Sequence, residues 1–201
     1  MTGIWRSNWN GSDWSEPERV WLQDADKLAL DGAAFVQGDS IWFASAREGY
    51  TGLNLFTAHS ENGEWQDWQY TGDLLNKELL VGEMHISADG TEMYFHSNRT
   101  GGIGGLDLWV MEFQNGEWQT PTNLAAVNSA GDEGWPFVSL DGNELWFTRT
   151  YFGTPAIYLS LKVDGNWSVP ELIVSPSPCH FEPRWPISNT YGSISSLMIA
   201  F

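Results

Sequence analysis

The sequence has a single cysteine, Cys179, among 201 residues. A disulfide requires two cysteines, and a zinc site built from thiolates requires several. The sequence therefore excludes an internal disulfide and a zinc–thiolate cluster. It gives no indication of the redox compartment.

Basic residues are also few. Nine Lys and Arg residues face 26 Asp and Glu residues, so the formal net charge is -17 at pH 7. Such a charge repels phosphate backbones and anionic lipid headgroups, and we expect no nucleic-acid partner. The acidic residues are spread along the chain, and such a distribution is typical of proteins whose surface charge promotes solubility or salt tolerance. Small molecules or glycans, neutral or cationic, are the expected partners.

Long apolar runs are absent as well. No stretch reaches the ~20 residues that a membrane-spanning helix needs, and we expect no membrane insertion. Residues 1–3 lead directly into a predicted strand, without a basic and hydrophobic leader. A processed chain would also lack its leader, and a secreted or periplasmic location is slightly favoured over a cytoplasmic one. We expect a monomer.

A repeated pairing of turn signals and tryptophans is present instead. A dipeptide such as Asn62-Gly63 or Asp164-Gly165 comes a few residues before each tryptophan of the series. These tryptophans are spaced by 51, 53 and 49 residues: Trp14, Trp65, Trp118 and Trp167. A period of about 50 residues, with short apolar stretches and tight turns, is typical of a propeller or a related repeat array.

The third copy of the repeat shows its unit most clearly. Its apolar stretches predict four short strands, at residues 134–139, 144–149, 156–162 and 166–172. Asp141-Gly142 and Asp164-Gly165 supply the positive φ angles that tight hairpin turns require. The unit is therefore predicted to be a four-stranded antiparallel meander, which is one blade of a propeller.

The two ends of the chain complement each other. Residues 3–20 match only a third and a fourth strand, and residues 182–201 match only a first and a second strand. Pairing the two ends completes a fourth blade and removes the exposed sheet edges. The sequence thus predicts an all-β fold, a four-bladed β-propeller in one domain over residues 1–201. Its ring of four-stranded antiparallel blades is closed by N-terminal strands that pair with C-terminal strands. The predicted blades are 32–72, 82–124, 133–173, and 182–201 together with 3–20.

Two segments carry a family resemblance. SADGTEMYFHSNRTGGIGGLDLW, from Ser87, and DEGWPFVSLDGNELWFTR, from Asp132, resemble the β-propeller repeats of the TolB type, which are related to WD repeats. The shared pattern is an acidic residue, a proline, S-x-D-G-x-x-L-Y-F, paired glycines and D-x-W. The resemblance covers essentially the whole chain, although it is weaker in the first copy and partial in the terminal blade. It implies a propeller fold; members more often have six or more blades and commonly occur in bacterial envelopes or secreted enzymes, so no single function follows.

Candidate functional residues follow from the propeller geometry. The first strand of each blade lines the central axis, so equivalent positions on the four inner strands are expected to converge. The positions that start these strands hold Asp31, Val81, Glu133 and Glu182. Two residues further along are Ala33, Glu83, Trp135 and Arg184. The predicted ligand-binding residues are Asp31, Glu83, His85, Glu133, Trp135, Glu182 and Arg184.

Three uses of the converging carboxylates stay open. Like charges at close range raise one another's pKa unless a cation or an arginine intervenes. Asp31, Glu133 and Glu182 are therefore candidate ligands of Ca²⁺ or another ion in the central channel. The same three residues are candidate acid and base groups for chemistry on a glycoside. The third alternative is that each acid caps backbone amides in its own loop.

The expected function is small-ligand binding in an acidic, aromatic-lined axial funnel. Trp135 breaks the repeat register, and an indole beside carboxylates suits stacking on a sugar or a cationic group. A glycan, or another neutral or cationic polar molecule, is the expected ligand. The sequence contains no nucleophile elbow, P-loop or dinucleotide fingerprint, and it leaves open whether the chain is an enzyme. A glycosidase-like enzyme that uses the funnel carboxylates and a protein-interaction scaffold are the alternatives.

Overall fold

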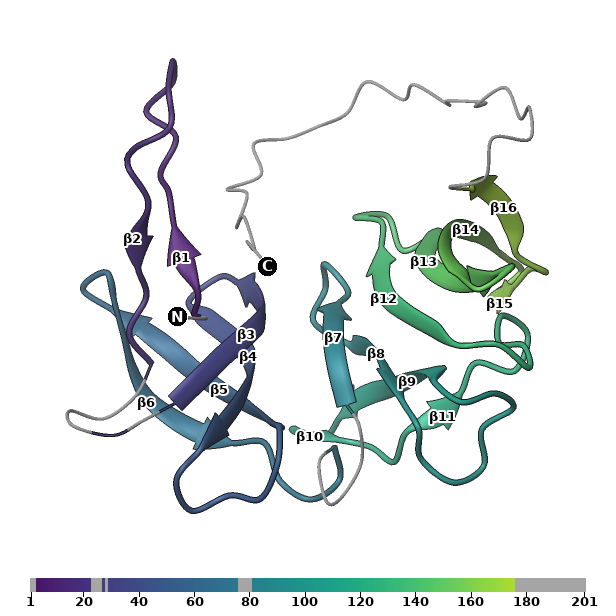
Figure 1. Cartoon of the computed structure of the whole chain (residues 1–201), viewed down its shortest axis with the longest axis horizontal. Helices are drawn as coiled ribbons and strands as arrows, with labels where there is room; N and C mark the ends of the chain where they lie inside the picture. The colour runs from purple at the N-terminus through teal and green to yellow at the C-terminus, as the bar shows by residue number, and fades with distance from the viewer. Residues whose placement is uncertain (1–2, 23–26, 28, 76–80, 176–201) are drawn as a thin grey trace. The chain divides into compact units, whose positions relative to one another are not determined.

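The computed structural model describes residues 3–22, 27, 29–75 and 81–175 (Figure 1). These residues form sixteen β-strands in antiparallel sheets, with no helix among them, so the all-β prediction is confirmed. No helix in these ranges could therefore span a membrane. The chain divides into two units, one up to Gly72 and the other from Asp73, and each is described by itself.

The first unit holds a hairpin and one four-stranded sheet. The hairpin consists of β1 (Trp5–Arg6) and β2 (Glu18–Arg19). The sheet has the order β3 (Ala29–Gln37), β4 (Ser40–Arg47), β5 (Asn54–Glu61) and β6 (Glu64–Tyr70). Asn62 and Gly63 both have positive φ, 56° and 84°, as the predicted turn between the last two strands requires.

The second unit holds two five-stranded sheets (Figure 1). The first contains β7 (Val81–Ile86), β8 (Glu92–Ser97), β9 (Asp107–Gln114), β10 (Glu117–Trp118) and β11 (Thr122–Asn123). The second contains β12 (Glu133–Val138), β13 (Glu144–Tyr151), β14 (Thr154–Val163), β15 (Asn166–Trp167) and β16 (Glu171–Val174).

Each predicted fourth strand in this unit is divided into two short strands. Both β10 and β11 pair with β9, and both β15 and β16 pair with β14. Pro121 and Pro170 lie in the interruptions. Proline has no N–H to donate to the ladder, so it interrupts the pairing there.

The N-terminal hairpin has the register of the outer half of a blade. Trp5 pairs with Arg19, as Trp109 pairs with Asn123 in the second unit. Trp9 bridges to Trp14, and the corresponding residues of β9 and β10, Phe113 and Trp118, also pair. Residues 3–20 thus fold as a third-and-fourth-strand hairpin. The strands predicted to complete this blade, in 182–201, lie outside the described residues, so closure of the ring stays a prediction.

The same apolar contact between neighbouring sheets recurs in both units. In the first unit, the hairpin packs on the blade through a cluster that includes Ile4, Val20, Phe43 and Phe56. In the second unit, the residues at the same register positions also form one cluster, including Leu108, Leu124, Phe147 and Tyr158. Burying one large apolar side chain contributes about 1.5–3 kcal/mol to the stability of the fold. This repeated contact between neighbouring sheets therefore supplies much of the core of each unit. Such stacked antiparallel meanders support a β-propeller.

The inner strands β3, β7 and β12 each carry one extra residue. Their registers shift after Gly32, Gly82 and Gly134, respectively. A bulge of this kind changes the direction of the side chains beside it. Trp135 lies in the bulge of β12 with a φ of 50°.

Candidate functional site

Asp31 is buried in the first unit beside an arginine. Its carboxylate accepts hydrogen bonds from Ser45 Oγ at 2.6 Å and from Arg47 Nη2 at 2.8 Å. Arg47 also donates to the carbonyl oxygen of Leu22 at 3.1 Å and to Ser45 Oγ at 3.0 Å. The side chains of Asp31 and Arg47 are 3% and 4% exposed, so the pair joins β3 and β4 to the segment that precedes them.

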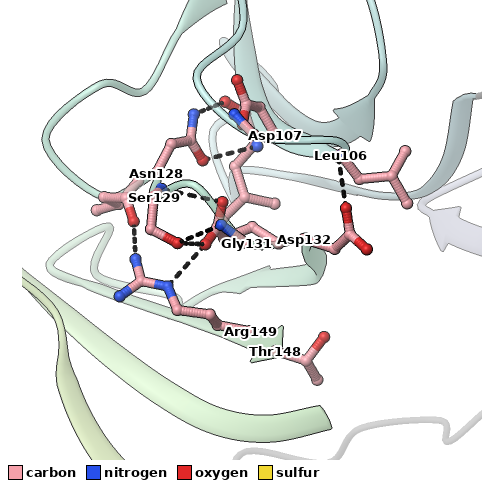
Figure 2. Close-up of polar contacts among 12 residues, drawn as sticks. Leu106, Asp107, Asn128, Ser129, Gly131, Asp132, Thr148 and Arg149 are labelled. Atoms are coloured by element: carbon pink, nitrogen blue, oxygen red, sulfur yellow. Dashed lines mark hydrogen bonds and ion pairs between the residues drawn. The ribbon is translucent and has the colours of Figure 1, made fainter. Parts of the chain in front are cut away.

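Glu133 is buried in the second unit with another arginine. Its carboxylate accepts from Ser129 Oγ at 2.5 Å, Ser129 N at 3.1 Å and Arg149 Nε at 2.7 Å (Figure 2). Arg149 Nη2 donates to the carbonyl oxygen of Val127. Burial raises the pKa of Glu133, and the bonds from Ser129 and Arg149 oppose this effect. The group therefore ties β12 and β13 to the loop that precedes β12.

A glycine-rich loop, residues 100–105, precedes β9. Two further carboxylates hold this glycine loop. Asp107 accepts hydrogen bonds from the backbone N–H groups of Ile103 and Gly104, at 2.5 and 2.9 Å. Asp132, beside Glu133, accepts from the N–H of Leu106 at 2.9 Å (Figure 2). Both carboxylates cap loop amides, which is the third of the uses that the sequence left open for acids of this kind.

Asp31 and Glu133 are thus engaged in different units, and neither carboxylate is exposed. Glu182 and Arg184 lie outside the described residues. Within the described ranges, no three His, Cys, Asp or Glu side chains gather closely enough to hold a metal ion. The ligand, ion and acid–base roles of Asp31, Glu133 and Glu182 stay predictions.

Glu83, His85 and Trp135, in contrast, come together in the second unit, where β7 packs against β12. His85 Nδ1 accepts a hydrogen bond from the backbone N–H of Val138 at 3.2 Å, which links the inner strands of two sheets. The His85 ring lies 4.6 Å from the ring of Phe137, centroid to centroid. Burial lowers the pKa of His85 to about 4, so the ring is neutral at pH 7 and its nitrogen can accept this bond.

His96, on β8, contacts both Glu83 and Trp135. Its Nε2 is 3.5 Å from Glu83 Oε2, and its ring centroid is 5.6 Å from that of Trp135. A methyl group on Gly82 would collide with His96 Nε2, and one on Gly134 would lie 3.2 Å from Nδ1. The two glycines therefore make room for the ring. Burial lowers the pKa of His96, and Glu83 opposes this effect.

His96 is the functional candidate that the sequence pattern missed. It lies on the second strand of its blade, outside the inner strands whose equivalent positions the sequence analysis compares. Gly82 and Gly134 leave room for this ring, but glycine also occupies the equivalent position of β3, Gly32, where no atom lies within 4 Å of an added methyl group, so the glycine pattern alone does not indicate it. His96 Nδ1 is buried without a hydrogen-bond partner among the described residues.

We call the group formed by Glu83, His85, His96, Trp135 and Phe137 the seam. Its outer part is open to solvent: Trp135 is 48% exposed, Phe137 is 47% exposed, and the Glu83 side chain is 32% exposed. A φ of 50° is strained for a bulky side chain such as that of Trp135. Ala33, at the equivalent position of β3, has a φ of 45°, so the bulge of the inner strand imposes this conformation. The seam thus presents a carboxylate and an indole that both lie against the ring of His96.

The neutral state of His85 predicts a pH dependence of stability. The pKa of this histidine is about 4 in the folded chain and 6.5 as its ordinary value. Because folding lowers the pKa of this base, the unfolded chain takes up its proton at a higher pH than the folded chain does. The free energy of unfolding is therefore highest above pH 6.5 and decreases as the pH falls toward 4. We expect the loss to be on the order of 2 kcal/mol after allowance for partial exposure.

Urea unfolding of the wild type and His85→Gln between pH 7.5 and pH 4 measures this effect. Glutamine retains an acceptor for the N–H of Val138 but does not titrate. The stability difference between the two proteins should therefore shift in favour of His85→Gln as the pH falls. Parallel pH profiles for the two proteins would contradict the burial of a neutral imidazole.

Comparison with models of protein families and with curated protein sequences finds no match. Several solved structures are similar in fold. TolB from Acinetobacter baumannii has a TM-score of 0.48 at 13% identity, over 68% of this chain and 30% of that one. Putative TolB from Agrobacterium tumefaciens has a TM-score of 0.43 at 17% identity, over 67% of this chain and 45% of that one. A prolyl endopeptidase has a TM-score of 0.40 at 11% identity, over 76% of this chain and 29% of that one. The matches thus span less than half of each of these structures, and the strand order and repeated register of this chain's own sheets are what support a β-propeller.

Proposed function

We propose that this chain is a small-ligand-binding β-propeller, and that the seam is its binding site. Trp135 carries the proposal: its half-exposed indole and the partly exposed carboxylate of Glu83 both lie against the ring of His96. Among the expected ligands, this pairing favours a small molecule with a cationic, alkylammonium-like group over a neutral glycan.

The electrostatics of the seam support a cationic ligand. His96 Nε2 lies 3.5 Å from Glu83 Oε2, and burial lowers the pKa of His96, which favours the neutral imidazole at pH 7. A neutral imidazole does not form an ion pair with a carboxylate. A cation over an indole face contributes about 0.5–2 kcal/mol, and a nearby carboxylate adds to the attraction. The net charge of -17 also raises the local concentration of cations.

We propose further that the fold is a TolB-type propeller of four blades, closed by residues 182–201. Two observations support closure. Residues 3–20 have only the outer half of a blade. Ile157 of β14, at the register position of the buried Leu108, is 41% exposed. A further strand pair would cover it.

The other expected functions have less support. Glycosidase chemistry needs two carboxylates that face the substrate, whereas Asp31 and Glu133 are buried with arginines in the described residues. A protein-interaction scaffold would rest on exposed apolar side chains such as Phe152 and Val169, which lie in separate loops of the described residues.

Replacing Trp135 tests the proposed site. Tetramethylammonium and choline serve as probes, because any ligand that prefers the folded state raises the melting temperature. We expect Trp135→Ala to weaken binding at least tenfold, about 1.4 kcal/mol, because it removes the indole face. Isothermal titration calorimetry at low salt measures this loss. Phe152→Ala, which removes an aromatic side chain that is 89% exposed, is the matched control and should bind as the wild type does.

A second variant separates binding from stability. Trp135→Gly also removes the indole but relieves the positive φ, so we expect it to be about 1 kcal/mol more stable than Trp135→Ala. Both variants should bind the probes equally poorly. Failure of both probes to bind the wild type, or unchanged binding by Trp135→Ala, would overturn the proposal.

A further inference from the structure

The first unit contains a second group of aromatic side chains, in a cleft of about 150 Å³. The cleft lies against β6 and the segment that follows β2. Its lining consists of Trp21, Leu22, Ala58, Trp65, Gln66, Asp67 and Trp68. We call it the tryptophan cleft. None of these residues belongs to the seam.

A bulge in β6 brings two of the indoles together. Residues three apart in a regular strand point to opposite faces of the sheet. Trp65 and Trp68 are three apart, yet both line the cleft. The pairing of β5 with β6 shifts by one residue here, and Asp67 within the shift has a φ of 50°. The extra residue turns Trp68 to the side of Trp65.

Trp68 is also a departure from the repeat. The position three residues after the repeated tryptophan is proline in the other three copies: Pro17, Pro121 and Pro170. The blade architecture therefore does not require an aromatic residue at this position. A side chain that departs from the repeat and lines a cleft with two other tryptophans indicates a specific use.

The two indoles on β6 are rigid platforms. Trp68 makes edge contacts with Phe56 at 5.7 Å and with Tyr50 at 6.5 Å, and the Arg47 guanidinium lies 4.4 Å from its ring centroid. Trp65 packs against the same apolar core. Little side-chain entropy is left to lose when a ligand stacks on such rings.

Charges of both signs flank the cleft. Asp67 contributes an exposed carboxylate, and Gln66 contributes an amide. The guanidinium of Arg19 lies 4.2 Å from the ring centroid of Trp21. Because the cation lies at Trp21 and the anion lies between Trp65 and Trp68, charges of opposite sign flank the cleft, which favours a neutral ligand that can donate and accept hydrogen bonds.

From this geometry we infer that the tryptophan cleft is a subsite for one neutral sugar ring of an oligosaccharide. A sugar ring presents an apolar face to an indole and hydroxyl groups to a carboxylate and an amide. The volume is below the roughly 300–1,000 Å³ of sites that enclose a drug-sized ligand, so one ring would dock while the rest of the oligosaccharide stays in solvent. This inference is independent of the seam, which favours cations.

Titration with neutral hexasaccharides tests the inference. Cellohexaose, maltohexaose and chitohexaose are added up to about 10 mM, in the range of weak affinities, and tryptophan fluorescence and saturation-transfer NMR are recorded. We expect saturable binding of at least one hexasaccharide. Trp21→Ala should weaken it at least tenfold, and Asp67→Asn several-fold. Raising the salt should have little effect on a neutral ligand.

The variants are chosen to keep the fold. Trp21 is 60% exposed, and asparagine tolerates the positive φ at position 67. Trp9→Ala, which removes a 53% exposed tryptophan of the same unit, is the control and should bind as the wild type does. The inference is overturned if no hexasaccharide binds, if Trp21→Ala binds undiminished, if Trp135→Ala abolishes binding, or if tetramethylammonium competes.

Discussion

Arg149→Met is expected to destabilise the protein by about 3–5 kcal/mol. The substitution removes the cation beside Glu133, whose side chain is 0% exposed, and leaves the carboxylate buried without an ionic partner. It also removes the donor to the carbonyl oxygen of Val127. Equilibrium unfolding in guanidinium chloride, with far-UV circular dichroism as the signal, measures the change.

A double variant identifies the cause. Glu133→Leu combined with Arg149→Met replaces the ion pair by apolar side chains, and we expect it to recover more than half of the lost stability. A cost below about 1 kcal/mol for Arg149→Met would be typical of an exposed ion pair. That result would contradict the buried ion pair and would indicate that the Glu133 carboxylate is accessible to solvent.

Gly104→Ala is expected to cost about 3 kcal/mol. A methyl group on Gly104 would collide with the carbonyl oxygen of Gly131 and would lie 2.7 Å from that of Ser129. Both neighbours are backbone atoms, so no rotamer change relieves the collision. Asp107 holds the same loop through its bond from the N–H of Gly104, which prevents the loop from moving away.

A matched glycine supplies the control. Gly32→Ala adds a methyl group with no atom within 4 Å and without a positive φ, so we expect a change below about 0.5 kcal/mol. Thermal unfolding of both variants measures the difference. Gly104→Ala with wild-type stability would show that the glycine loop does not pack against the turn at Ser129 to Gly131.

The sequence pattern was most informative about turns and strands. The turn at Asn62-Gly63 and the strand pairing of the third copy are as predicted, because alternating apolar residues and positive-φ dipeptides are local signals. The division of the fourth strand was not predicted. Pro121 and Pro170, which lie at the divisions, were visible in the sequence and could have indicated them.

The environment of the acids could be predicted only in part. The sequence places Asp31 and Glu133 at the start of inner strands; Glu133 is the first residue of β12, whereas β3 begins two residues before Asp31. Their arginine partners follow each acid by 16 residues, yet they occupy different register positions. Arg149 pairs directly across from Glu133, whereas Ser45 lies across from Asp31 and Arg47 reaches it from two residues further on. A contact of this kind depends on side-chain direction in three dimensions.

The seam shows the same limit. Glu83 and Trp135 were predicted together because they occupy equivalent positions of two inner strands. His96 was missed because repeat alignment compares equivalent positions, whereas His96 reaches the seam from the neighbouring strand β8. The bulges that direct Trp135 toward His96 leave no periodic signal in the sequence.

The most direct test of the proposed ligand site is an NMR titration of the thirteen tryptophan indole N–H groups with tetramethylammonium. The resonance of Trp135 is assigned by its absence from the spectrum of Trp135→Phe. We predict that this resonance shifts saturably and that the shift is lost in Glu83→Gln. A Trp135 resonance that stays unchanged across the titration would contradict binding at the seam.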